Sequence, residues 1–149
     1  MNLLTFACAE SLEENFDYGI YYDPTSRNHV KLFSHIGFYS NQAIVGIGEV
    51  SKITACDLIG GSIIIQPGFD QTLSAVEKDR IMKTINTSSF NIAVGHKFIL
   101  VDKVEKTNFL KGTPGPLRWK KYIDLSIYPS IFPTDNTNTV ARKLNSLFW

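Results

Sequence analysis

The chain has 149 residues, and at about 100–200 residues per domain we expect a single domain over 1–149. Fifteen Lys and Arg residues nearly balance fourteen Asp and Glu residues, giving a net charge of +1, which excludes a histone-like basic protein and an acidic disordered tail. With 44% hydrophobic residues, two cysteines and no apolar run of about 18 residues, the sequence predicts a folded chain without a disulfide framework or a membrane span. A reducing cytoplasm is the default location.

The charge is distributed unevenly along the chain. Residues 1–26 contain five acidic residues and no Lys or Arg, whereas residues 97–121 contain seven basic residues and two acidic ones. A basic stretch of this kind is typical of a surface that faces phosphate groups. Lysines that only solvate a loop and the ends of strands give the same pattern, so charge alone does not identify such a surface.

Short apolar runs indicate that strands dominate the middle of the chain. The clearest are His35–Tyr39 and Ala43–Ile53, and Ser40-Asn41-Gln42 between them has the composition of a turn, which predicts a β-hairpin. In the second strand Gly46 and Gly48 share one face. Two glycines on one face leave a gap, at which the strand bends or another backbone or a flat ligand approaches. Further strands are expected at 3–9, 62–66, 97–104 and 122–128, the last with Ile123, Leu125 and Ile127 pointing inward.

Helices are expected near both ends of the chain and in its middle. Ser11–Asn15 has the pattern of a helical turn, with Ser11 as its N-cap and Glu14 completing a capping box. A longer helix is expected from Leu73 to about Asn86, and another near the end of the chain. The candidate cap residues are Asp70 or Thr72 for the longer helix and Thr137 or Asn138 for the last one. Five to seven short strands with these helices predict an α+β fold, a small, partly open β-barrel with flanking helices.

The residues that carry catalysis or bind metals do not form a known motif. The sequence has no phosphate-binding Gly-x-x-x-x-Gly-Lys-Ser/Thr loop. Its histidines, His29, His35 and His96, are scattered, and neither cysteine has a second cysteine nearby, so we expect no metal site and no cofactor. Cys8 beside a histidine would be a nucleophile, but its position in an apolar strand favours a buried thiol.

The first third of the chain arranges its elements in a familiar order. An opening strand, Leu3–Cys8, runs into Glu10-Ser-Leu-Glu-Glu-Asn15, and Tyr18-Gly-Ile-Tyr-Tyr22 follows. The hairpin then supplies His35-Ile-Gly-Phe-Tyr39 and Ile44-Val-Gly-Ile-Gly-Glu-Val50. This order resembles the EVE and YTH group of PUA-like domains.

The resemblance implies a PUA-like, EVE-like barrel that binds nucleic acid, commonly a flipped or modified base held between aromatic rings. It places Ser11, Asn15, Tyr21 and Tyr22 in the pocket. Asn15 would bond the edge of the base, and Tyr21 or Tyr22 would stack on it, an interaction of about 1–3 kcal/mol per base. These residues also have local explanations, because a serine caps helices, an asparagine closes turns and tyrosines fill cores.

The residues themselves add Trp119, which lies between cations just after a loop rich in Gly and Pro. Its ring can stack on a base while neighbouring cations meet phosphates. Alternatively, the ring plugs one end of the barrel. The candidate phosphate-binding residues are Lys111, Arg118, Lys120 and Lys121.

We therefore expect a non-catalytic domain that binds DNA or RNA, working alone or beside a partner protein that supplies catalysis. One alternative is a sensor that binds a free or signalling nucleotide in the same pocket. A second is an ASCH-like hydrolase, although the chain lacks the Gly-x-Lys-x-x-Glu-x-Arg motif of that group. A third is a protein-interaction module that uses its aromatic surface.

Overall fold

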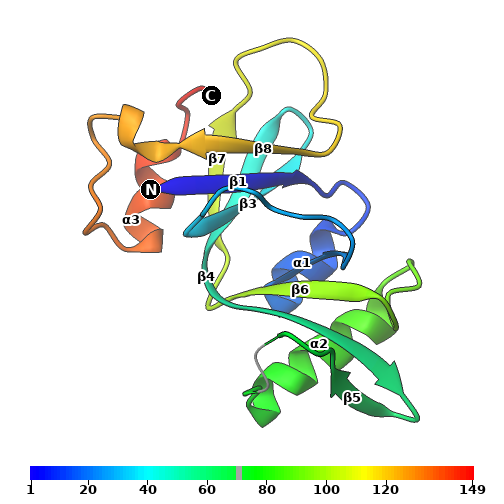
Figure 1. Cartoon of the computed structure of the whole chain (residues 1–149). Coiled ribbons are helices and arrows are strands. Elements are labelled where there is room, and N and C mark those ends of the chain that lie inside the picture. The colour runs from blue at the N-terminus through cyan, green and yellow to red at the C-terminus, as the bar shows by residue number, and fades with distance from the viewer. Residues whose placement is uncertain (70–71) are drawn as a thin grey trace.

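The computed structural model describes residues 1–69 and 72–149 and shows a mixed α+β fold (Figure 1). The expected fold class is thereby confirmed at this level. The strands are β1 (Asn2–Ala7), β2 (Ile20–Pro24), β3 (His35–Ser40), β4 (Ala43–Ile59), β5 (Ser62–Ile65), β6 (His96–Val101), β7 (Glu105–Leu110) and β8 (Lys120–Asp124). The helices are α1 (Leu12–Tyr18), α2 (Ala75–Thr87) and α3 (Thr137–Leu144), with a 3₁₀ helix, η1, at Leu125–Ile127.

The eight strands form one open sheet in the order β2-β6-β4-β3-β1-β8, with β5 and β7 also paired to β4. β1 and β3 run parallel, and the other pairs are antiparallel. β4 has 17 residues; its first part pairs with β3 and β7, and its second part pairs with β6 and β5. β4 thus joins an upper and a lower group of strands in Figure 1. β2 ends this order, so its outer edge pairs with no strand of the described chain.

β2 and β7 lie outside the ranges expected for strands, and they bring the total to eight, above the five to seven expected. β7 is the more polar of the two. Its exposed residues Lys106 and Asn108 alternate with half-buried ones, and Phe109 is its fully buried residue. The hydrophobic signal of such a strand is weak, because one face is polar and the other is only partly covered.

The hairpin of β3 and β4 is confirmed, and Asn41 and Gln42 form its turn with φ of 51° and 67°. The strand expected at 122–128 is wrong in its second half, because β8 ends at Asp124 and η1 follows. The Asp124 carboxylate accepts a hydrogen bond from the backbone N–H of Ser126 at 2.9 Å, which begins the turn. Ile127 consequently points outward and is 67% exposed.

The gap that Gly46 and Gly48 leave on β4 is filled by side chains. A Cβ atom on Gly46 would lie 2.5 Å from the Phe16 ring, and one on Gly48 would lie 2.6 Å from the Val101 side chain. The expectation that another backbone or a flat ligand approaches here is therefore wrong. α1 and β6 pack on β4 through these two contacts.

The cap of α2 differs from the one expected. The Ser74 hydroxyl accepts a hydrogen bond from the Glu77 N–H, and the Glu77 carboxylate accepts one from the Ser74 N–H. This capping box satisfies two of the unpaired N–H groups at the start of the helix. It replaces the cap expected at Thr72; the alternative, Asp70, lies outside the described residues.

The other two caps also correct the expectation. α3 is capped by Asn136, whose side chain accepts a hydrogen bond from the Thr139 N–H, and not by Thr137 or Asn138. Ser11 occupies the N-cap position of α1 but makes no side-chain cap bond. Its hydroxyl is used elsewhere, as described below.

One cluster of buried side chains joins the two groups of strands. Phe6 of β1, Tyr21 of β2, Phe38 of β3 and Ile99 of β6 are members of it. The cluster fixes β2 against β1, although these strands do not pair with each other. Among the described residues, none of the helices combines the length and the apolar character needed to cross a bilayer.

Candidate ligand pocket

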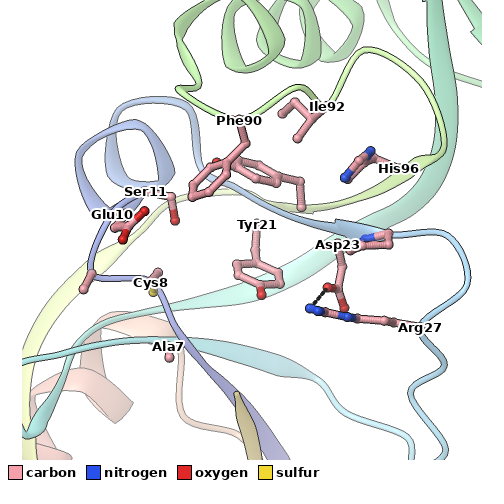
Figure 2. A pocket seen from close by; sticks show the side chains of 13 residues that line it. Ala7, Cys8, Glu10, Ser11, Tyr21, Asp23, Arg27, Phe90, Ile92 and His96 are labelled. Carbon is pink, nitrogen blue, oxygen red and sulfur yellow. Dashed lines mark hydrogen bonds and ion pairs between the residues drawn. The ribbon is translucent and has the colours of Figure 1, made fainter. Parts of the chain in front are cut away.

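A pocket of about 500 Å³ lies beside β2 (Figure 2). The connection from β1 to α1, the connection from β2 to β3 and the connection from α2 to β6 border it. Its volume is within the range of about 300–1,000 Å³ that is usual for small-molecule sites. The lining residues are Ala7, Cys8, Ala9, Glu10, Ser11, Tyr21, Tyr22, Asp23, Pro24, Arg27, Phe90, Ile92 and His96.

Tyr21 occupies the middle of the pocket wall (Figure 2). Its ring stacks on that of Phe6, with centroids 3.8 Å apart and planes inclined by 13°. Phe6 is fully buried, so it supports the Tyr21 ring from behind and fixes its orientation. Burial raises the pKa of the Tyr21 hydroxyl, so this side chain stays neutral. It therefore offers the pocket a rigid, uncharged aromatic surface.

The Tyr22 ring lies nearly parallel to that of Tyr21, with centroids 6.3 Å apart, and Tyr22 is held by polar contacts. Its hydroxyl donates a hydrogen bond to Glu14 Oε1 at 3.0 Å, and Ser88 Oγ lies 2.9 Å away. Since the phenol has a single proton, Ser88 is the donor in the second bond. Burial is the main cause that raises the pKa of Tyr22 to about 12 and also raises the pKa of Glu14. Phe90 approaches the Tyr22 ring at 6.5 Å and is 46% exposed, so it is an accessible aromatic group.

Ser11 and Asn15 form a chain of hydrogen bonds beneath the pocket. The Ser11 hydroxyl donates to Asn15 Oδ1 at 2.8 Å, and Asn15 Nδ2 donates to the Ile20 carbonyl at 2.7 Å. Asn15 is fully buried and is not among the lining residues, whereas Ser11 is. Asn15 therefore positions Ser11 and the start of β2 from below.

Arg27 connects the pocket to a second surface. It lines the pocket, and its Nη1 donates to Asp23 Oδ1 at 2.9 Å. Its guanidinium also lies 5.1 Å from the centre of the Trp119 ring, and Lys120 Nζ lies 4.2 Å from the same ring. We call Arg27, Trp119 and Lys120 the Trp119 shelf. The Ala7 N–H donates to the Trp119 carbonyl at 2.9 Å, so the shelf adjoins the pocket wall.

The four cations expected to meet phosphates do not gather at one place. In the described structure, Lys120 is the one of them that contacts Trp119. Lys111 and Lys121 lie over the Trp149 ring instead, at 5.9 and 5.2 Å from its centre. Arg118 is exposed. Trp119 itself is 43% exposed and is not among the pocket's lining residues.

The titratable groups of the pocket do not resemble a nucleophilic site. The Cys8 thiol lies 3.2 Å from the Phe6 carbonyl and 3.5 Å from that of Tyr39, which it can donate to, and burial raises its pKa to about 12. It is therefore a protonated, weakly reactive thiol at neutral pH. His96 donates from Nδ1 to the Val94 carbonyl at 2.8 Å, because a carbonyl can only accept. No group of three or more His, Cys, Asp or Glu residues that could hold a metal ion occurs in residues 1–69 and 72–149.

Several pocket residues were missed from the sequence. Phe90 is the aromatic residue of a stretch that otherwise looks like a polar loop, and this contrast is a signal that could have been used. Arg27 is the first basic residue of the chain and follows Asp23 at a spacing of four. His96 and Ile92 give no such signal, because His96 reaches the pocket through the pairing of β2 with β6, and Ile92 lies in the connection that leads into β6.

Comparisons of the chain with protein-family models, with curated proteins and with solved structures give no significant match. The geometry alone offers stacking on neutral aromatic rings and a cationic shelf beside them. These two features suit a ligand in which a flat, apolar ring is joined to an anionic group.

Proposed function

We propose that this chain is a non-catalytic nucleic-acid-binding domain. A base would stack on the aromatic wall of the pocket, and its phosphates would meet the Trp119 shelf. The observation that carries the proposal is the position of Arg27, whose side chain lines the pocket and also lies over the Trp119 ring. A ligand that joins an aromatic ring to a phosphate can contact both surfaces at once.

The residues divide into two roles. Tyr21, with Phe6 behind it, and the exposed ring of Phe90 provide the stacking surfaces. The Ser11 hydroxyl oxygen can accept a hydrogen bond from the edge of the base, because its proton is donated to Asn15, which holds that serine in place. Stacking accepts any base, so the pocket is suited to DNA and to RNA, and to modified bases as well as ordinary ones.

We further propose that the upper group of strands is a PUA-like, EVE-like barrel. Residues 147–149 support this, because they continue along β7: the Leu110 N–H donates to Leu147 O at 2.8 Å, and the Trp149 N–H donates to Leu110 O at 2.9 Å. Lys121 of β8 lies 5.2 Å from the centre of the Trp149 ring. This segment thus extends from β7 toward β8, the two strands between which a barrel would close.

A free nucleotide is the second candidate ligand. The pocket of about 500 Å³ favours it, because that volume suits one nucleotide and needs no polymer. Salt distinguishes the two candidates. The affinity for a polymer falls steeply as salt rises, by about 0.7 log units per log unit of salt for each phosphate contact on a single strand. A single nucleotide gives a shallow dependence.

Fluorescence anisotropy with short labelled RNA and DNA, unmodified and methylated, at two salt concentrations tests the proposal. We expect binding that weakens with salt and that is reduced by Tyr21→Leu about 5- to 150-fold, the equivalent of one stacked base. Tyr128→Leu is the matched control, since Tyr128 packs on Phe109 in a different cluster. Equal loss in both variants, or no binding by the folded wild type, would contradict the proposal. Turnover of a probe without a partner would favour the hydrolase alternative.

A further inference from the structure

The His29 ring lies between Asp23, which binds Arg27 of the Trp119 shelf, and Lys120, which belongs to that shelf. Its Nε2 is 3.4 Å from Asp23 Oδ2, and its Nδ1 is 3.1 Å from Lys120 Nζ. Asp23 also holds Arg27, so both cations of the shelf are linked to this one ring. The His29 side chain is 6% exposed and that of Asp23 is 1% exposed. Solvent therefore does little to screen these charges.

The neighbours of His29 determine which of its nitrogens carries the proton. An ammonium group has no lone pair, so Lys120 can only donate and His29 Nδ1 must accept. The single proton of the neutral ring is then on Nε2, facing Asp23. Neither His29 Nε2 nor Asp23 Oδ2 has a hydrogen-bond partner with good geometry among the described residues. The contact between them is therefore loose in the neutral state and has room to tighten.

A second proton on His29 would change both contacts. It would occupy Nδ1 and remove the acceptor of Lys120, whose other contacts include the Asn28 carbonyl at 2.9 Å and the rings of Trp119 and Tyr122. The imidazolium would also form an ion pair with Asp23. The cluster would then carry one more positive charge, and the Lys120 ammonium group would have a free donor for an anion bound at the shelf.

The charged groups around His29 link its protonation to the binding of an anion. Asp23 is the carboxylate of the cluster, and Arg27, Lys97 and Lys120 are its cations. The neutral hydroxyl of Tyr21 also faces Asp23, and the rings of Phe6 and Phe33 close the remaining sides. A protonated His29 would add a fourth positive charge to this cluster, and an anion on the shelf would interact favourably with that charge. Protonation and anion binding must then favour each other to the same extent.

We propose that His29 is a positioning residue that couples the binding of a polyanion at the Trp119 shelf to the uptake of a proton. This inference rests on the proposed function, in which the shelf meets phosphates. Affinity for nucleic acid should consequently be higher at a pH of about 5.5 than at about 7.5. Coupling of about 1–3 kcal/mol is usual between linked sites, so we expect an increase of about fivefold or more.

The experiment compares the wild type with His29→Gln, using a labelled thymidylate oligomer of about 12 residues without a terminal phosphate. Thymine does not titrate in this range, so the probe itself contributes no pH dependence. Glutamine can accept from Lys120 through its oxygen and donate to Asp23 through its nitrogen, as neutral histidine does. We expect the pH response to disappear in His29→Gln. An unchanged response in that variant would overturn the inference.

Two measurements on the wild type make the test independent of the variant's folding. Calorimetry of probe binding in two buffers of different ionisation enthalpy measures proton uptake, which we expect to be positive; zero uptake would overturn the inference. Nitrogen-15 NMR of the free protein reports the tautomer of His29. The Nε2–H form supports the inference, and the Nδ1–H form overturns it. If the probe does not bind at either pH, the proposed function fails, and the tautomer still decides the arrangement around His29.

Discussion

The ring of Tyr21 rests on the ring of Phe6, and this contact joins β2 to β1 across the interior of the molecule. The two strands do not pair with each other. The stacked pair therefore connects the two groups of strands through side chains, in addition to the backbone connection that β4 provides. It also gives the pocket wall its rigidity, because Tyr21 cannot tilt without moving a fully buried phenylalanine.

Replacing Phe6 with leucine should lower the free energy of unfolding by about 1–2 kcal/mol, because the aromatic pair is lost and some volume is left unfilled. Urea denaturation measures this change. Phe90→Leu is the matched control, since Phe90 is 46% exposed and should change stability little. An equal loss in the two variants would mean that the Phe6–Tyr21 stack contributes nothing specific.

The close contacts of β4 predict the effect of adding a methyl group. Gly48→Ala would place its Cβ 2.6 Å from the Val101 side chain, and overpacking of this kind destabilises a core by about 1–3 kcal/mol. In the double variant with Val101→Gly, the Cβ, Cγ1 and Cγ2 atoms that crowd this position are all absent. We therefore expect the loss in the double variant to be smaller than the sum of the single losses, measured as a double-mutant cycle. Simple additivity would show that the glycine is not needed for this contact.

Local patterns in the sequence determined most of the strands and the hairpin correctly, because alternation and turn composition are properties of neighbouring residues. The caps were displaced because several adjacent residues can each cap a helix, as around Ser74 and Asn136. The pocket was harder to anticipate. Arg27 is close to Tyr21 in the chain, but Phe90 and His96 come from a distant segment, and the pairing of β2 with β6 brings that segment to Tyr21. No local pattern encodes that pairing.

Glu14 should destabilise the fold at neutral pH. Burial raises its pKa, and its Oε2 is a buried atom without a hydrogen-bond partner among the described residues. A raised carboxyl pKa means that the folded state keeps the proton longer than the unfolded state does. Its contribution to stability is thus present below the ordinary value of about 4.3 and is lost as the pH rises through the raised pKa.

Glu14→Gln removes this dependence while keeping an acceptor for the Tyr22 hydroxyl. We expect the variant to gain in stability relative to the wild type as the pH rises from about 4 to 7. Urea unfolding across that range measures the difference, and Glu13→Gln, at a more exposed position of the same helix, is the control. If the free energies of unfolding of Glu14→Gln and the wild type differ by the same amount at all pH values, folding does not raise the pKa of Glu14.

His35 should make the protein sensitive to acid. Its side chain is buried, and burial lowers its pKa below the ordinary value of about 6.5. As the pH falls below that value, the unfolded state takes up a proton before the folded state does, so stability decreases. His35→Gln should flatten this part of the stability profile, which denaturation at a series of pH values measures. If the variant and the wild type lose stability in parallel, His35 is not the group responsible.

The division of the basic residues between Trp119 and Trp149 leads to a prediction about salt. Lys120 lies on the shelf, whereas Lys111 lies over Trp149 and donates to the Thr113 carbonyl at 2.7 Å. Replacing Lys120 with glutamine should reduce the slope of log affinity against log salt by about 0.7–0.9, the value of one lost phosphate contact. The same replacement at Lys111 should leave the slope unchanged, because that residue faces a different surface. Anisotropy titrations of one oligonucleotide at several salt concentrations measure both slopes. A reduction in Lys111→Gln but not in Lys120→Gln would place the path of the nucleic acid along Trp149 and remove the shelf from the binding site.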